Sequence, residues 1–239
     1  MKIEVLYPEI ANLYGDSFNY RYLKQTLKDT EFIETSLTDK PKFIDKKNNV
    51  KFVYIGSMTE EGEKIVIEKL QPYKEAIKEY IENDNVFLAT GNSFEIFGNY
   101  IEKEEEKLEA LQIFDFYSKL DFNHRHNSLF IGEFNNSKIV GFKSEFSFSY
   151  REDGKYNFIK VDKGVGLNKE DFYEGIKYKN FYGTYLLGPI LPMNPYFTKF
   201  LLKQIKKDVE PAFMDAAIEA YDFRVKEIMD PETVIIPNH

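Results

Sequence analysis

The chain contains no cysteine and no tryptophan among its 239 residues. Without cysteine it cannot form disulfides, hold zinc through thiolates or use a thiolate nucleophile. No apolar run approaches the ~20 residues that span a bilayer, and the start of the chain enters a strand without a signal-peptide pattern. We therefore expect a cytoplasmic protein with no membrane partner.

Positive charge is also in short supply, with 32 Lys and Arg against 40 Asp and Glu. The net charge of -8 argues against a nucleic-acid partner, because phosphate binding needs clustered basic residues. Hydrophobic residues make up 43% of the chain, including 22 Phe and 17 Tyr, so a large core is available. The chain shows no internal repeat and no linker, and we expect residues 1–239 to form one domain.

Strands and helices alternate over the first hundred residues. Apolar runs predict strands at residues 3–7, 32–37 and 50–55 and a fourth from Val86. Helical spacing predicts helices that start at Ser17, cover residues 60–70 and run from Pro72 through Ile81. This rhythm is typical of a parallel sheet with crossover helices.

The second half has a different texture. The charge run at residues 102–107 is interpreted as a solvated loop or helix face. Short strands are predicted at residues 129–131, 139–142, 156–161 and 182–187, with turn signals between them. Two helices, starting near Pro195 and Pro211 and ending near Met229, are expected to pack on the domain over residues 195–230.

Residues 86–98 read as a buried strand, a sharp turn and a helix. Many hydrolases hold their nucleophile on such a turn, because its strained geometry lifts one side chain clear of the sheet. The residue at the apex here is Gly91, which has no side chain. The sequence thus offers the frame of a nucleophile elbow without the nucleophile.

Four segments together resemble the class I glutamine amidotransferases of the cobyric acid synthase type. They are Leu-Tyr-Gly-Asp-Ser-Phe-Asn at 13–19, Tyr-Ile-Gly-Ser at 54–57, the elbow, and the stretch 183–195 with its Leu-Gly-Pro-Ile-Leu-Pro-Met-Asn-Pro end. The likeness is strongest to the glutaminase subunits of lipid II isoglutaminyl synthases, which partner a Mur-ligase-like ATP-dependent protein. It implies a three-layer, flavodoxin-like α/β fold with a mostly parallel central sheet.

In that family a Cys thiolate attacks the side-chain amide of glutamine, a His passes the proton to departing ammonia, and backbone N–H groups hold the oxyanion. The resemblance places the Cys position at Gly91 and the His position at Leu187. Losing one member of such a set costs about 10⁴–10⁶ in turnover. We therefore predict a catalytically degenerate homologue that needs no cofactor and acts as a non-catalytic subunit.

The old glutamine pocket is expected to retain ligand-binding residues. The candidates are Gly56, Ser57, Asn92, Ser93, Arg125 and Tyr185. The pocket is predicted either to hold a small-molecule ligand or to persist beside a Mur-ligase-like partner.

In two alternative hypotheses the protein is an active enzyme. In one, Ser93 or Thr90 replaces the missing nucleophile and the chain still supplies ammonia for cell-wall or cobyric-acid-type amidation. In the other, a different hydrolase or transferase uses the crevice beyond the strand ends. The histidines His124, His126 and His239 offer no evident base, since the first two read as exposed loop residues.

The remaining charged residues are given structural interpretations. Lys143 and Glu145, which replace family residues in the stretch 141–145, are read as solvated or paired surface charges, with acid–base chemistry as the alternative. Four acidic residues lie near one another without regular ligand spacing, so no metal site is predicted there. They are Asp162, Glu170, Asp171 and Glu174.

Overall fold

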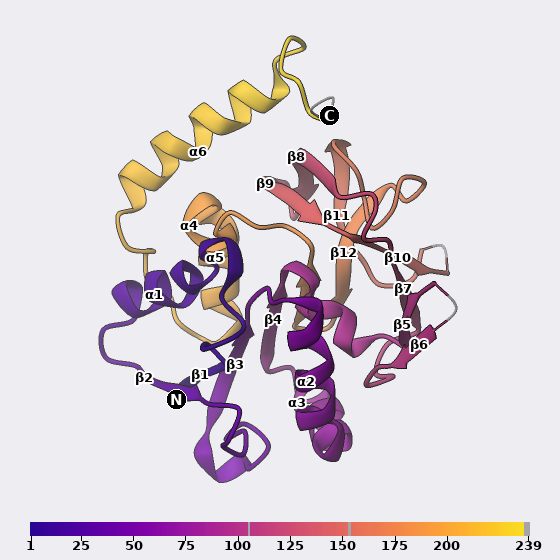
Figure 1. Cartoon of the computed structure of the whole chain (residues 1–239). Helices are drawn as coiled ribbons and strands as arrows, with labels where there is room; N and C mark the ends of the chain where they lie inside the picture. Colours follow the sequence, from indigo (N-terminus) through magenta and orange to yellow (C-terminus); the bar gives the residue numbers. More distant parts are fainter. Residues whose placement is uncertain (105, 153, 237–239) are drawn as a thin grey trace.

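The computed structural model describes residues 1–104, 106–152 and 154–236. Within these ranges the strands form one nine-stranded and one four-stranded sheet (Figure 1). The large sheet has the order β2-β1-β3-β4-β13-β12-β11-β8-β9. Its strands are β1 (Lys2–Leu6), β2 (Glu31–Thr35), β3 (Val50–Ile55), β4 (Val86–Thr90), β8 (His126–Phe134), β9 (Ser137–Glu145), β11 (Asn157–Lys163), β12 (Tyr173–Tyr178) and β13 (Phe181–Thr184).

The sheet is parallel from β2 to β13 and antiparallel from β13 to β9. The helices α1 (Ser17–Thr26), α2 (Glu60–Leu70) and α3 (Lys74–Glu82) connect the parallel strands, which confirms the predicted rhythm. α2 begins where predicted because the Thr59 hydroxyl accepts a hydrogen bond from Gly62 N at 3.1 Å. The carboxyl ends of β3 and β4 therefore meet at one edge of the sheet.

Successive side chains of a strand point to opposite faces of the sheet, so alternate residues pack in two separate cores. Val53 and Ile55 of β3 pack in the core that α2 and α3 cover. Phe52 and Tyr54 of the same strand pack in the core beneath α1 and the later helices. The molecule thus has helices on both faces of the sheet, which are the three layers expected.

The charge run at residues 102–107 was wrongly interpreted as a loop or helix face. Apart from residue 105, it belongs to the hairpin of β5 (Tyr100–Lys103) and β6 (Glu106–Glu109). With β7 (Phe116–Leu120) and β10 (Ser147–Arg151), these strands make the small sheet in the order β10-β7-β5-β6. Charged side chains suit β6 because an edge strand must resist pairing with other chains.

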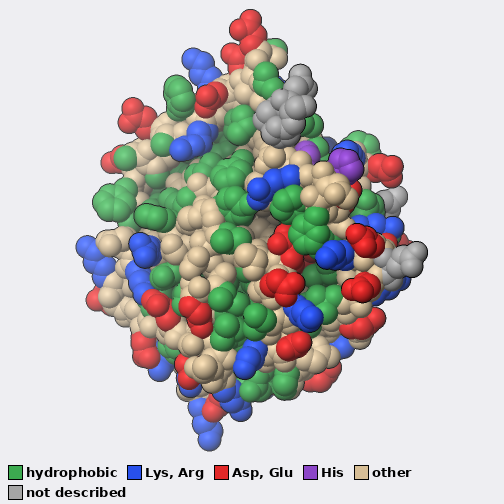
Figure 2. Space-filling model, viewed as in Figure 1, with side chains coloured by type: hydrophobic (Ala, Val, Ile, Leu, Met, Phe, Trp, Pro, Cys, Tyr) green, Lys and Arg blue, Asp and Glu red, His purple; other side chains and the backbone are tan. Residues whose placement is uncertain are grey.

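The C-terminal part forms α4 (Ile190–Met193), α5 (Pro195–Gln204) and α6 (Met214–Met229). α5 buries Phe197, Leu201 and Leu202 against the sheet, whereas α6 buries only Tyr221 and Ile228. Both predicted helices are present, although α6 begins three residues beyond Pro211. In the described ranges no helix is long and apolar enough to cross a membrane. Figure 2 shows basic and acidic side chains interspersed over one face of the molecule.

Candidate functional site

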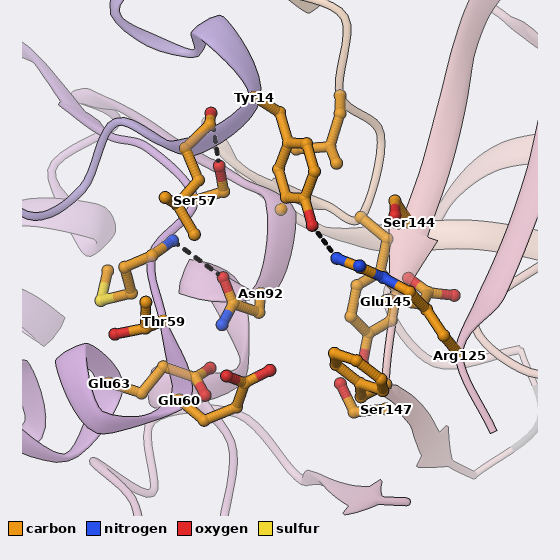
Figure 3. Close-up of a pocket in the computed structure, with 16 residues that line it drawn as sticks. Tyr14, Ser57, Thr59, Glu60, Glu63, Asn92, Arg125, Ser144, Glu145 and Ser147 are labelled. Atoms are coloured by element: carbon orange, nitrogen blue, oxygen red, sulfur yellow. Dashed lines mark hydrogen bonds between the residues drawn. The ribbon is translucent and has the colours of Figure 1, made fainter. Parts of the chain in front are cut away.

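A cavity of about 190 Å³ opens at the carboxyl ends of β3 and β4 (Figure 3). The segments that follow β1, β3 and β4 contribute to its lining, at the sheet edge where ligands bind in open α/β sheets. Its lining includes the predicted residues Ser57, Asn92, Arg125 and Tyr185, together with Gly91 and Leu187. Gly56 and Ser93 lie outside this lining.

The apex of the elbow is closely packed. Gly91 has φ +63°, a conformation that favours glycine. A Cβ atom added there would lie 2.3 Å from Cβ of Ser57 and 3.1 Å from Cδ2 of Leu187. The helix expected after the apex is present as 3₁₀ turns over Gly91–Phe97. The turn therefore keeps its left-handed backbone, while Ser57 and Leu187 occupy the space beside it.

Asp16 ties the two strand ends together. Its Oδ2 accepts hydrogen bonds from the Ser57 N–H at 2.8 Å and from the Thr90 hydroxyl at 2.7 Å. Burial raises the pKa of this carboxyl, and those hydrogen bonds oppose the rise. In the sequence, Asp16 belongs to the segment 13–19 that carries the family resemblance, but its bonding partners could not be predicted because they are far away in the chain. Because the Thr90 hydroxyl donates its hydrogen bond to Asp16, it is not directed at a substrate in the cavity.

Ser93 is directed away from the cavity. Its hydroxyl donates to the carbonyl oxygens of Thr90 at 2.8 Å and Ile55 at 3.3 Å, and the side chain is fully buried. A hydroxyl that donates to backbone carbonyls in this way stabilises the turn.

Arg125 closes one side of the cavity. Its Nη2 donates a hydrogen bond to the Tyr14 hydroxyl, and its guanidinium carbon lies 4.8 Å from the centre of the Phe146 ring. Figure 3 shows the Tyr14–Arg125 contact reaching across the mouth of the cavity. The arginine is thus held by one phenol and one aromatic face.

The neighbouring histidines do not line the cavity. His124 is exposed, with Nδ1 2.7 Å from Oδ2 of Asp121, in agreement with a loop histidine. His126 instead opens β8, where burial and the charge of Lys143 lower its pKa to about 4. His239 lies outside the described residues.

Lys143 and Glu145 were wrongly interpreted as surface charges. Lys143 is fully buried, with Nζ 3.0 Å from Oε2 of Glu174 and 3.0 Å from Oε1 of Glu145. Nζ also donates to the Gly166 carbonyl oxygen at 2.6 Å. Strand alternation places Lys143 and Glu145 on one face of β9, and that face is covered. A lysine can be buried only with such partners.

Three of the four acidic residues considered as a metal site are held in separate ion pairs, and the fourth is Glu170. Glu174 pairs with Lys143, Asp171 with Arg151 at 3.2 Å, and Asp162 with Lys138 at 2.8 Å. Within the part of the chain that the structure describes, no group of three or more His, Asp or Glu side chains is placed to hold a metal ion.

Glu95 lies beneath the cavity and was missed by sequence reasoning. Its Oε1 accepts hydrogen bonds from the Tyr185 hydroxyl at 2.7 Å and from the Ser147 hydroxyl. Burial raises its pKa from 4.5 to about 7, and these hydrogen bonds oppose the rise. From the sequence, a glutamate beside a turn is expected to face solvent. Its burial follows only from its partners Ser147 on β10 and Tyr185 after β13.

The Glu95 carboxyl makes stability depend on pH. Between pH 4.5 and about 7 the unfolded chain loses this proton while the folded chain keeps it. The contribution of Glu95 to the free energy of unfolding therefore falls as pH rises, by about 1.4 kcal/mol per pH unit. We expect Glu95→Gln to remove this slope, measured by urea unfolding of both proteins from pH 4.5 to 8. Equal slopes in the two proteins would contradict the assignment.

Comparison with known proteins decides the family. A model of the CobB/CobQ-like glutamine amidotransferase domain matches residues 2–195. The chain belongs to this family. The resemblance inferred from the sequence is thereby confirmed.

Two relatives of this CobB/CobQ-like chain are subunits named GatD of glutamine-hydrolyzing lipid II isoglutaminyl synthases. The Staphylococcus aureus subunit is 31% identical over 198 residues, covering 81% of this chain and 79% of its own. The Streptococcus pneumoniae subunit is 28% identical over 229 residues, covering 90% and 86%.

Solved structures agree on the fold. The structure of PurLQS from Thermotoga maritima matches 94% of this chain and 98% of its own, with a TM-score of 0.55 and 13% identity. The glutaminase domain of CTPS from Trypanosoma brucei, with bound acivicin, covers 87% of this chain and 95% of its own, with a TM-score of 0.55 and 12% identity. The α/β fold class of the CobB/CobQ-like family is therefore confirmed.

Proposed function

We propose that this chain is a non-catalytic, glutamine amidotransferase-like subunit that works with a Mur-ligase-like ATP-dependent partner in the amidation of a cell-wall precursor. The proposal draws on the two relatives, whose names describe subunits of lipid II isoglutaminyl synthases. It also draws on the sequence, which has glycine and leucine at the two positions that the resemblance assigns to the nucleophile and the base. The cavity would then bind a small ligand instead of turning over glutamine.

The observation that carries the proposal is the contact between Ser57 and the apex. A side chain at Gly91 would overlap Cβ of Ser57 at 2.3 Å, so a cysteine does not fit the turn as it is packed. Leu187 fills the same corner with an apolar group that cannot accept a proton. The packing of Gly91, Ser57 and Leu187 thus supports the absence of a thiol and its base from this corner.

The alternative of an active amidotransferase gains no support from Ser93. A nucleophilic hydroxyl needs a base within about 3 Å and access to the substrate. The Ser93 hydroxyl instead donates to two backbone carbonyls and lies outside the cavity lining. The crevice itself lies beyond the strand ends, where ligands bind in open α/β sheets.

We expect the purified chain to release no ammonia from glutamine above the uncatalysed rate, with or without a Mur-ligase-like partner. An enzyme-coupled ammonia assay checks this, with the Staphylococcus aureus GatD subunit and its partner as the positive control. Robust ammonia release would refute the proposal. Release that Ser93→Ala abolishes would establish the alternative nucleophile.

A further inference from the structure

Glu63 is a buried carboxyl with an unused hydrogen-bonding oxygen. Its side chain lines the cavity although the residue is only 2% exposed, and its Oε1 has no hydrogen-bond partner. Figure 3 shows Glu63 and Glu60 on one wall of the cavity, across from Arg125. An unpaired buried carboxyl is costly, so a ligand that donates to this oxygen would gain affinity from it.

The surroundings of Glu63 are acidic. Burial raises the pKa of Glu63 well above its usual range, and the charges of Glu95 and Glu60 raise it further, while an Asn92 hydrogen bond opposes the rise. Among the described residues, none of these three glutamates forms an ion pair with Lys, Arg or His, and Arg125 across the cavity is held by Tyr14. Within the described residues, these glutamates therefore have no direct ion-pair partner.

The space beside these carboxyls suits a small organic group. The cavity of about 190 Å³ corresponds to about six water molecules at the volume of liquid water. A second groove of about 260 Å³, between α2 and the small sheet, is lined by the same Glu60 and Glu63 and also by Lys64, Lys103 and Lys107. The two carboxyls thus lie between two spaces, and a ligand seated at them can extend into either.

A protonated primary amine matches these features. Its three N–H donors can serve the free oxygen of Glu63 and the Glu60 carboxyl together, and its positive charge favours the ionised form of both carboxyls. A bound metal ion matches less well, because the described residues offer no group of three ligating side chains.

We propose that the wall formed by Glu60 and Glu63 binds the protonated primary amine of a small-molecule ligand. This inference rests on the proposed function, in which the cavity holds a ligand rather than turning over glutamine. The amine lies between the two carboxyls, and the rest of the ligand occupies the cavity toward Asn92 and Tyr185.

Ethylammonium chloride is the probe, with ethanol as the neutral control of similar size. Binding to the full chain is followed at pH 7.5 by two-dimensional NMR titration at constant ionic strength. We expect saturable shifts around α2 with ethylammonium and none with ethanol. Glu63→Gln should weaken binding about 10-fold or more, as expected for losing a charge-assisted hydrogen bond. The matched control is Glu68→Gln, an exposed glutamate on α2 that lines neither the cavity nor the second groove, which should leave binding unchanged.

Thermal unfolding of each variant checks that it folds, and Glu60→Gln gives a second test if Glu63→Gln does not. No binding by the unaltered chain, equal binding of ethanol, or equal affinity in Glu63→Gln and Glu68→Gln would overturn the inference. The two proposals fail separately. Glutamine hydrolysis would refute the non-catalytic role without affecting amine binding, whereas loss of the amine site would leave the ammonia assay unchanged.

Discussion

Lys143→Met is expected to lower the free energy of unfolding by about 3–5 kcal/mol, because it leaves buried carboxyls without their cation. Lys143 is completely buried between Glu145 and Glu174. Its charge is the direct partner of both carboxyls, and the lysine also satisfies the carbonyl oxygen of Gly166. Urea unfolding at pH 7 measures the loss.

Lys138→Met is the matched control on the same strand. Lys138 also pairs with two carboxylates, those of Glu133 and Asp162, but its side chain is 32% exposed. An exposed pair of this kind contributes about 0–1 kcal/mol. Changing Lys143 to Met together with Glu145→Gln and Glu174→Gln should recover most of the stability, since no buried charge remains uncompensated. A loss below about 1 kcal/mol in Lys143→Met would show that the buried network is not ionised as described.

Gly91→Ala should destabilise the fold by about 2–4 kcal/mol, through backbone strain at φ +63° and overlap with Ser57. The cost of the overlap with Ser57 can be measured separately from the cost of the backbone strain. Introducing Ser57→Gly removes the Cβ that lies 2.3 Å from the added atom, so the penalty of Gly91→Ala should then fall toward strain alone. A double-mutant cycle by urea unfolding gives the coupling, expected at about 1–3 kcal/mol.

Gly15→Ala controls for strain without crowding. Gly15 has φ +78°, and a Cβ there would meet nothing within 4 Å. We expect a cost of about 1–2 kcal/mol, the backbone contribution alone. If Gly91→Ala costs no more than Gly15→Ala, or if Ser57→Gly gives no relief, the apex is not closed by Ser57.

Much of the parallel half was predictable because each element carries a clear period. β3 and α2 have the predicted bounds, since an unbroken apolar run and a helical repeat leave little choice. The hairpin of β5 and β6 was missed because its exposed positions carry charges, which hide the period of two. The strand predicted at residues 182–187 ends earlier, at Thr184, and Leu187 instead forms an isolated bridge with Phe142.

The site was predictable only in part, and for a physical reason. The turn signal at the elbow led to Gly91, and the family resemblance of the elbow and of the loop after Gly56 led to Ser57 and Asn92. Glu63 lies on a helix face that reads as polar, and its burial follows only from the cavity formed with residues on other elements. Glu95 is likewise explained by partners 52 and 90 residues away in the chain.

The contact between Ser57 and the apex also sets an order on evolutionary change at this site. A substitution that placed a cysteine at position 91 would meet Cβ of Ser57 and lower stability before any activity could be selected. Ser57 must become glycine first, a step that by itself confers no chemistry and forfeits the hydrogen bond from Ser57 Oγ to the Leu13 carbonyl oxygen. Under the proposed function, the packing at the apex therefore makes loss of a nucleophile at position 91 easier to acquire than to reverse.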